Sequence, residues 1–266
     1  MKFKDQLNNT IELQATPKRI ICLVPSITEL LVDLGLRDCI VGITKFCMHP
    51  ANLRKEKKIV GGTKNINFDK IKSLNPDFII CNKEENTKTI VSQCKSITAT
   101  YVSNIFTIKD TLDLIKDFGI IFFCTEKATD VSQRIENAHL GFLKFMRNKQ
   151  SKNVAYFIWK NPWMVAANHT FIHHLLELNN FKNIYGTKNR YPEIDIENLK
   201  DFNDLEYIFL SSEPYPFNDK HIKELKSKTT GTKVILVNGE YFSWYGSRLL
   251  KAFDYFKLLQ NTINKE

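Results

Sequence analysis

The tryptophans mark where this chain could bind a ligand. Trp159, Trp163 and Trp244 all lie at or just after apolar runs that predict β-strands. Aromatic rings give a large contact area at low entropic cost, which suits a flat and partly apolar ligand. The alternative for Trp159 is that its indole closes the hydrophobic core. The cluster as a whole favours a binding site for a bulky planar molecule.

Two groups of side chains resemble parts of a metal site. Cys47 and His49 lie close enough in sequence to ligate a metal ion or the metal centre of a cofactor, but no third ligand follows nearby. His169 and His173 would share one face of a helix with His174 beside them, although the metalloprotease pattern His-Glu-x-x-His is absent. We interpret these histidines as partly solvated imidazoles. The sequence predicts no resident metal, and it leaves open whether Cys47 and His49 touch the metal of a bound ligand.

A glycine turn and one arginine are the other candidates for polar contacts. Gly61-Gly62-Thr63-Lys64 matches neither the P-loop nor the Rossmann pattern, so it predicts a tight turn near a ligand or a plain structural turn. Arg248 follows the Trp244 loop and can make two parallel hydrogen bonds to a carboxylate or phosphate of a ligand. The alternative is an internal ion pair with Glu213 or Glu240. No Gly-x-Ser-x-Gly elbow is present, which disfavours acyl transfer.

Composition and charge limit the class of partner. The chain has 266 residues, 43% of them hydrophobic, and a formal net charge of +9. Basic and acidic residues are interspersed and no nucleic-acid-binding motif appears, so we expect no nucleic-acid partner and read the charge as a bias toward anionic partners. No apolar stretch approaches the roughly 18 residues that a membrane span needs. The six cysteines contain no Cys-x-x-Cys pair, which favours reduced thiols.

Apolar runs alternate with amphipathic segments along most of the chain. The run at 18–24 is continuous and stops at Pro25, which is typical of a strand buried on both faces, and a helix that Ser26 can cap follows it. This alternation predicts parallel sheets covered by helices. Further strands are expected at 39–43, 58–60, 77–81, 97–102, 153–159, 164–167, 207–211 and 233–237. Further helices are expected at 68–74, 84–94, 171–180, 194–202 and 249–263.

One long segment separates the two alternating parts of the chain. Residues 125–149 contain no proline, and their apolar positions recur at the spacing of one amphipathic helix, long enough to link two lobes. We therefore expect an N-terminal α/β lobe at residues 1–104, connecting helices at 105–150 and a C-terminal α/β lobe at 151–266.

Several short motifs occur in an order that resembles one family of binding proteins. They are Pro17-Lys18-Arg19-Ile20-Ile21, Pro25-Ser26-x-Thr28-Glu29, Gly61-Gly62 and Leu74-Asn75-Pro76-Asp77-Phe78-Ile79-Ile80, followed by the long helix and the Arg248 loop. In this order the chain resembles the class III substrate-binding proteins of ABC importers, the helical-backbone family that includes cobalamin-, haem- and siderophore-binding proteins. It looks most like the cobalamin-binding branch. The resemblance implies two three-layer α/β lobes joined by one long rigid helix, with the ligand cleft between the lobes.

The resemblance also implies which residues face the ligand. Tyr191 aligns with a cleft tryptophan of the cobalamin-binding branch, whereas Asn82 stands where another cleft tryptophan is expected. The Trp244 loop has an aromatic residue where the cobalamin binder has arginine. The residues that we expect to contact the ligand are Ser26, Cys47, His49, Gly62, Thr63, Asn82, Trp159, Trp163, Tyr191, Glu213, Trp244, Tyr245 and Arg248.

Docking on a permease is the second contact that the resemblance implies. Family members use one acidic residue from each lobe against arginines of the permease. Glu197 aligns with the acid of the second lobe, but Lys88 occupies the first position, so Glu84 or Glu85 would have to replace it. The family role implies the periplasm or the cell envelope. The first residues, 1–7, show no secretory signal, so the chain as written is expected in the cytoplasm.

Together these features predict a receptor that binds without making or breaking bonds. We expect a monomeric substrate-binding protein of an ABC importer, which binds a metal chelate such as cobalamin or another corrinoid, haem or a ferric siderophore. It requires no cofactor, has no catalytic residue and docks on an ABC permease. The alternative is a cytoplasmic enzyme or sensor that binds a metallocofactor in the same cleft, in which Cys47 or His49 would engage the metal.

Overall fold

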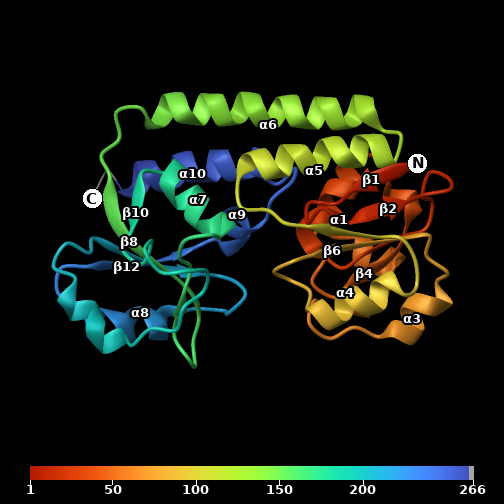
Figure 1. The fold of residues 1–266 in the computed structure, drawn as a ribbon. Coiled ribbons are helices and arrows are strands. Elements are labelled where there is room, and N and C mark those ends of the chain that lie inside the picture. The colour runs from red at the N-terminus through yellow and green to blue at the C-terminus, as the bar shows by residue number, and fades with distance from the viewer. Residues whose placement is uncertain (264–266) are drawn as a thin grey trace. The chain divides into compact units, whose positions relative to one another are not determined.

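The chain divides into two compact units in the computed structural model, which describes residues 1–263 (Figure 1). Unit 1 contains Met1–Asn137 and Tyr245–Leu249, and unit 2 contains Ala138–Trp244 and the described residues from Leu250 onward. Helix α6 (Thr125–Met146) begins in unit 1 and ends in unit 2. The long helix expected at 125–149 is therefore confirmed, with its end at Met146.

Unit 1 is built on a parallel sheet with the strand order β5-β4-β3-β6-β7. Its strands are β3 (Ile20–Cys22), β4 (Ile40–Thr44), β5 (Lys58–Gly61), β6 (Phe78–Asn82) and β7 (Thr100–Ser103). Helices α3 (Phe68–Ser73) and α4 (Lys88–Lys95) cover one face, and α1 (Pro25–Asp33) and α5 (Ile108–Ile121) cover the other (Figure 1). This is the three-layer arrangement predicted from the continuous apolar runs, because parallel strands are buried on both faces.

Helix α5 folds as part of unit 1. A capping box at Thr107 and Asp110 begins the helix, and the ring of Phe118 packs against Tyr101 of β7 with centroids 5.4 Å apart. The sequence placed this helix with the connecting segment at 105–150, and it placed residues 245–249 with the C-terminal lobe. Both segments lie in unit 1 because their side chains are buried against it.

Unit 2 has a second parallel sheet with the order β10-β8-β11-β12, to which β9 adds an antiparallel strand beside β8. Its strands are β8 (Lys152–Trp159), β9 (Met164–Val165), β10 (Phe181–Asn183), β11 (Tyr207–Ser211) and β12 (Lys233–Val237). Its helices are α7 (Phe171–Leu178), α8 (Asp219–Lys226), α9 (Gly239–Ser243) and α10 (Leu249–Ile263).

Helices cover both faces of this second sheet as well. Leu225 of α8 packs with Phe157 and Leu210 on one face, and Phe242 of α9 contacts Tyr156 on the other, with ring centroids 5.1 Å apart. Figure 1 shows α8 and α10 on opposite faces of the sheet. The two α/β units expected from the sequence are thus confirmed.

The remaining elements are short. Strands β1 (Lys2–Lys4) and β2 (Thr10–Glu12) pair antiparallel, and α2 (Leu53–Glu56) precedes β5. Two turns of 3-10 helix lie at Arg37–Cys39 and Ile196–Asp201, the second where the sequence predicts a helix at 194–202. Within residues 1–263, no helix combines the length and the apolar character needed to span a membrane.

Two glycines should respond in opposite ways to alanine. Gly61 has a φ of +138°, and a Cβ there would lie 2.4 Å from the carbonyl oxygen of Asn65, whereas a Cβ at Gly141 of α6 would meet no atom within 4 Å. We expect Gly61→Ala to lower the free energy of unfolding by more than about 1 kcal/mol, and Gly141→Ala to raise it by about 0.4–1 kcal/mol. Urea unfolding of both variants measures the two changes. Equal effects of the same sign would contradict this reading of the turn.

Candidate functional site

Each parallel sheet has one point where its connections change direction. In unit 1 the chain crosses from β3 to β4 on one side and later returns past β3 to β6 on the other, so the switch point lies between β3 and β6. In unit 2 the same reasoning places it between β8 and β11. Open parallel sheets bind ligands beyond the carboxyl ends of their strands at such points. The loops that follow these strands are therefore the candidate site.

Asn82 organises the loop after β6. It is only 2% exposed, and its amide nitrogen donates to the hydroxyl of Ser103 over 3.0 Å. Its side-chain oxygen accepts hydrogen bonds from the backbone N–H groups of Glu84 at 2.8 Å and Glu85 at 3.1 Å. Such a turn is typical of asparagine. Asn82 therefore shapes the loop from within, which differs from the ligand contact that its alignment implies.

The turn after β5 is held against the same loop. The side-chain amide of Asn86 donates to the carbonyl oxygen of Thr63 over 2.9 Å, and the ammonium of Lys64 donates to the carbonyl oxygen of Glu84 over 2.6 Å. Gly62 is buried and Thr63 is half-buried. The structure thus brings the glycine turn and the loop after β6 together at one edge of unit 1.

Ser26 and Tyr245 lie inside unit 1 rather than on its surface. Their exposed fractions are 3% and 6%, and burial raises the pKa of the Tyr245 phenol well above its usual value. Tyr245 belongs to the short segment at 245–249 that joins unit 1 from late in the sequence. Both side chains are therefore part of the interior of unit 1 and offer little surface to a ligand.

Arg248 has a different partner from those that the sequence suggested. Its guanidinium donates through Nε and Nη2 to the two carboxylate oxygens of Glu29, over 2.7 and 2.8 Å. The two side chains are 3% and 9% exposed. Next to this pair, the hydroxyl of Ser247 donates to the carboxylate of Asp33. Arg248 therefore forms an internal ion pair, the kind of alternative that the sequence left open, with Glu29 as a partner that the sequence did not suggest. The ligand contact of Arg248 stays a prediction.

Sequence reasoning missed Glu29 as the partner because it read this residue as part of a helix start. The available signal was an acidic side chain within the apolar stripe of α1, where Ile27, Leu30 and Leu31 are fully buried. A buried carboxylate in such a stripe requires a cation or hydrogen-bond donors.

Cys47 belongs to the loop that follows β4, and its side chain is fully buried. Its sulfur lies 3.3 Å from the hydroxyl of Thr28 and 3.4 Å from that of Thr44. Burial raises the pKa of the Cys47 thiol, so the thiolate that would ligate a metal is disfavoured. His49 is half-buried in the same loop. Among residues 1–263, no cluster of three or more His, Cys, Asp or Glu side chains is arranged to hold a metal ion.

The switch point of unit 2 carries an exposed indole. Trp159 ends β8 with 39% of its surface exposed, and it meets the ring of Tyr215, which follows β11, at 5.5 Å and an angle of 73°. Trp163 lies deeper: its indole stacks on Phe217 at 5.9 Å, and the ammonium of Lys160 lies 4.9 Å from its ring centre. Aromatic side chains thus gather after β8 and β11, with Trp159 as their accessible member, and their contact with a ligand stays a prediction.

Glu213 and Trp244 are joined to each other. The indole nitrogen of Trp244 donates to a carboxylate oxygen of Glu213 over 2.7 Å, and the hydroxyl of Ser243 donates to the same oxygen over 3.1 Å. Trp244 is 7% exposed. Its role is therefore to hold the loops after β11 and β12 together, which differs from the stacking contact that its sequence position suggested.

The other expected residues are spread over the surface loops. Tyr191 is half-buried, Glu84 and Glu85 are half-buried in the loop after β6, and Glu197 is exposed and paired with Lys228. In the histidine group, His173 lies 3.4 Å from Glu177 on α7, which agrees with the helix-face interpretation.

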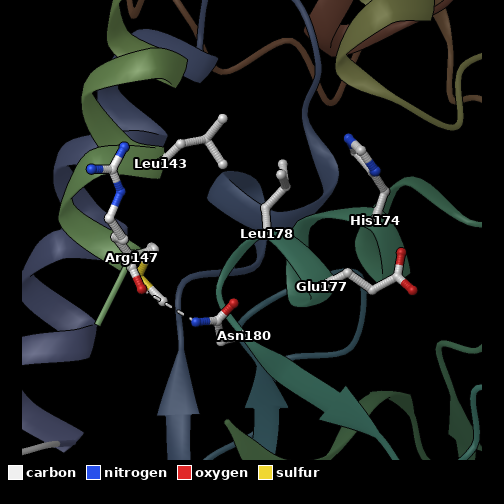
Figure 2. Close-up of a pocket in the computed structure, with 7 residues that line it drawn as sticks. Leu143, Arg147, His174, Glu177, Leu178 and Asn180 are labelled. Carbon is white, nitrogen blue, oxygen red and sulfur yellow. Dashed lines mark hydrogen bonds between the residues drawn. The ribbon is translucent and has the colours of Figure 1, made fainter. Parts of the chain in front are cut away.

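A cavity of about 380 Å³ lies elsewhere in unit 2, between the ends of α6 and α7. Figure 2 shows Leu143 of α6 and Arg147, which directly follows α6, on one side, and His174 and Glu177 from α7 on the other. None of the predicted ligand contacts lines this cavity. Asn180, which lines the cavity, directly precedes β10, so the cavity lies at the amino ends of the strands, away from the loops of the candidate site.

Comparison with known proteins gives a consistent family. Residues 20–234 match the family described as periplasmic binding protein. An uncharacterized ABC transporter substrate-binding lipoprotein, YvrC of Bacillus subtilis (strain 168), is 35% identical over 79 residues, which are 30% of this chain and only 24% of that protein. A vitamin B12-binding protein of Vibrio vulnificus (strain CMCP6) is 25% identical over 199 residues, 71% of this chain and 70% of that protein.

Solved structures share the fold. The periplasmic vitamin B12-binding protein BtuF of Vibrio cholerae has a TM-score of 0.78 at 21% identity, covering 94% of this chain and 99% of that chain. The periplasmic heme-binding protein HutB of Vibrio cholerae has a TM-score of 0.75 at 18% identity, covering 92% and 98%. At these identities the likeness establishes the fold alone.

The ion pair between Glu29 and Arg248 should be costly to break from one side. We expect Glu29→Gln or Arg248→Met to lower the free energy of unfolding by about 3–5 kcal/mol, because each leaves an uncompensated buried charge. The matched control is Lys109→Met, which breaks a pair with Asp113 whose side chains are 81% and 52% exposed; it should cost less than about 1 kcal/mol. Urea unfolding measures all three. Similar losses at both pairs would contradict the role assigned to burial.

Proposed function

We propose, because the chain belongs to the periplasmic binding protein family, that it is the substrate-binding receptor of an ABC importer and that its ligand is a metal chelate. The family expected from the sequence is confirmed by the match over residues 20–234. The relatives include a vitamin B12-binding protein, and the solved structures include a periplasmic heme-binding protein. These relatives and solved structures favour a cobalamin-like corrinoid, haem or a ferric siderophore as the ligand.

The exposed indole of Trp159 is the observation that carries this proposal. A tryptophan that keeps 39% of its surface in solvent, at the end of a strand beside the switch point, offers a flat apolar face where this type of sheet binds ligands. Tyr215 supports the indole from its edge. A planar chelate that stacks on Trp159 would remove this surface from water. The cleft between lobes that the resemblance implies stays a prediction.

We also infer binding without bond-making. The alternative used Cys47 or His49 on a metal. Cys47 is buried beside two threonine hydroxyls, and burial raises the pKa of its thiol. The carboxylate of Glu213 accepts hydrogen bonds from Trp244 and Ser243. These contacts favour a receptor over the enzyme that we kept as the alternative.

Docking on a permease is the second part of the proposal. Glu197 is exposed on unit 2, where Lys228 pairs with it, so a permease arginine would have to compete with a surface ion pair of small net strength. On unit 1, Glu84 and Glu85 remain the proposed acids. Both are half-buried, which makes them weaker candidates than Glu197.

Removing the exposed indole should weaken ligand binding. Trp159→Ala should lower the affinity for the bound chelate by at least about 1 kcal/mol, roughly fivefold in Kd, because the stacking surface is lost. The probes are cobalamin, haem and a ferric siderophore, with binding followed by visible absorption and native mass spectrometry.

Two controls separate stacking from general damage. Trp159→Phe keeps a ring and should retain most of the affinity, and Leu258→Ala removes a side chain that is 67% exposed on α10 and should leave Kd unchanged. An unchanged Kd in Trp159→Ala would remove this residue from the site. If none of the three probes binds at micromolar concentration, the proposed ligand class is wrong.

A further inference from the structure

Two lysines follow the ends of neighbouring strands in unit 1. Lys45 comes directly after β4, and Lys83 comes directly after β6. Only β3 lies between these strands. Both side chains are exposed.

The register of the sheet places the two lysines within one residue of the same level. Cys22 of β3 pairs with Ile43 of β4 on one side and with Ile80 of β6 on the other. Counted from this common level, Lys45 and Lys83 are two and three residues further along. Because adjacent strands lie about 4.8 Å apart, the two backbones emerge about 10 Å from each other, on either side of β3 and next to the switch point.

The partners of both ammonium groups are aromatic rings. The ammonium of Lys45 lies 5.1 Å from the ring centre of Phe46, and that of Lys83 lies 5.8 Å from the ring centre of Phe106, in the loop after β7. Within residues 1–263, neither lysine takes part in an ion pair. A ring holds a cation in place without cancelling its charge. Phe46 itself is 47% exposed, so an apolar surface accompanies the charge.

Other charges at the strand ends are already engaged. In unit 2, Lys160 pairs with Glu224, and Glu213 accepts from Trp244. In unit 1, Glu84 and Glu85 lie in the same loop as Lys83, but both are half-buried and both interact with other groups. Lys45 and Lys83 are thus more exposed than the two carboxylates beside them, and they present positive charge to a ligand at this edge of unit 1.

We propose that Lys45 and Lys83 select an anionic metal chelate, one that carries carboxylate or similar acidic groups on its periphery, over an uncharged chelate of the same shape. This inference rests on the proposed receptor function and adds the charge of the ligand to it. The lysines give directed contacts to the acidic groups, and Phe46 gives contact to the apolar body of the chelate. The net charge of +9 assists the approach of such a ligand.

A matched pair of ligands tests the charge directly. Haem carries two propionate groups, and haem dimethyl ester has the same ring without those charges; both are titrated into the full chain in the same dilute detergent, and cobalamin serves as a further uncharged chelate. We expect haem to bind about tenfold tighter than the ester, with a preference that shrinks as salt is raised from 0.05 to about 0.5 M.

Matched variants assign the preference to the two lysines. Lys45→Gln combined with Lys83→Gln should weaken haem binding by about tenfold and leave the ester unchanged, which removes the preference. Lys45→Glu combined with Lys83→Glu should reverse it. The control variant is Lys72→Gln. Lys72 is exposed on α3, the helix that leads to the amino end of β6, and its substitution should change neither the Kd of haem nor the Kd of the ester. Thermal unfolding of each variant verifies that the fold is retained.

The outcomes separate this inference from the proposed function. If a chelate binds but haem and its ester bind equally, or if the preference survives the double glutamine variant, the charge selection is wrong while the receptor function stands. If the ester binds more tightly than haem to the unmodified chain, the inference is overturned in the same way. If none of the chelates binds, both proposals fail together.

Discussion

The parallel pairing of strands is the constraint on which the rest of this protein depends. When neighbouring strands run in the same direction, their carboxyl ends meet at one edge and each connection must pass over a face of the sheet. Helices therefore cover both faces, and the strands become fully buried, as the five residues of β6 show. A ligand cannot reach the faces of either sheet. The loops at the carboxyl edge can present polar and aromatic side chains to a ligand, and both switch points lie there.

The segment at 245–249 adds a second constraint, because it fixes the interior of unit 1 with residues from the far end of the chain. Arg248 and Glu29 are 219 positions apart, yet they form a buried pair with two short hydrogen bonds. A buried pair of this kind adds little net stability compared with apolar packing, but either charge alone is strongly unfavourable. Its effect is therefore specificity: this segment, with Tyr245 buried beside it, has one favourable position in unit 1.

Local patterns in the sequence predicted most of the fold, because a buried parallel strand and an amphipathic helix each have their own signature. The strands from β3 to β12 were expected, apart from β10, whose three residues are too short to show a pattern. The site was harder to predict. Trp159 and Trp244 had similar positions in the sequence pattern, after apolar runs, yet one ends β8 and is 39% exposed, and the other follows α9 and is 7% exposed. The Trp244 indole donates a hydrogen bond to Glu213, 31 residues earlier in the chain. Local sequence patterns do not reveal partners at such a distance.

The two edges differ in the kind of free energy they can offer a ligand. At unit 2 the accessible group is an indole, whose contribution grows with the apolar area it covers and depends little on salt. At unit 1 the accessible groups include the lysines beside Phe46 and Phe106, whose contribution depends on charge, distance and ionic strength. Aromatic area gives affinity for many flat molecules, and charge discriminates among them and speeds their approach. Because each property depends on loops at the end of a sheet, each can change without disturbing the buried strands beneath.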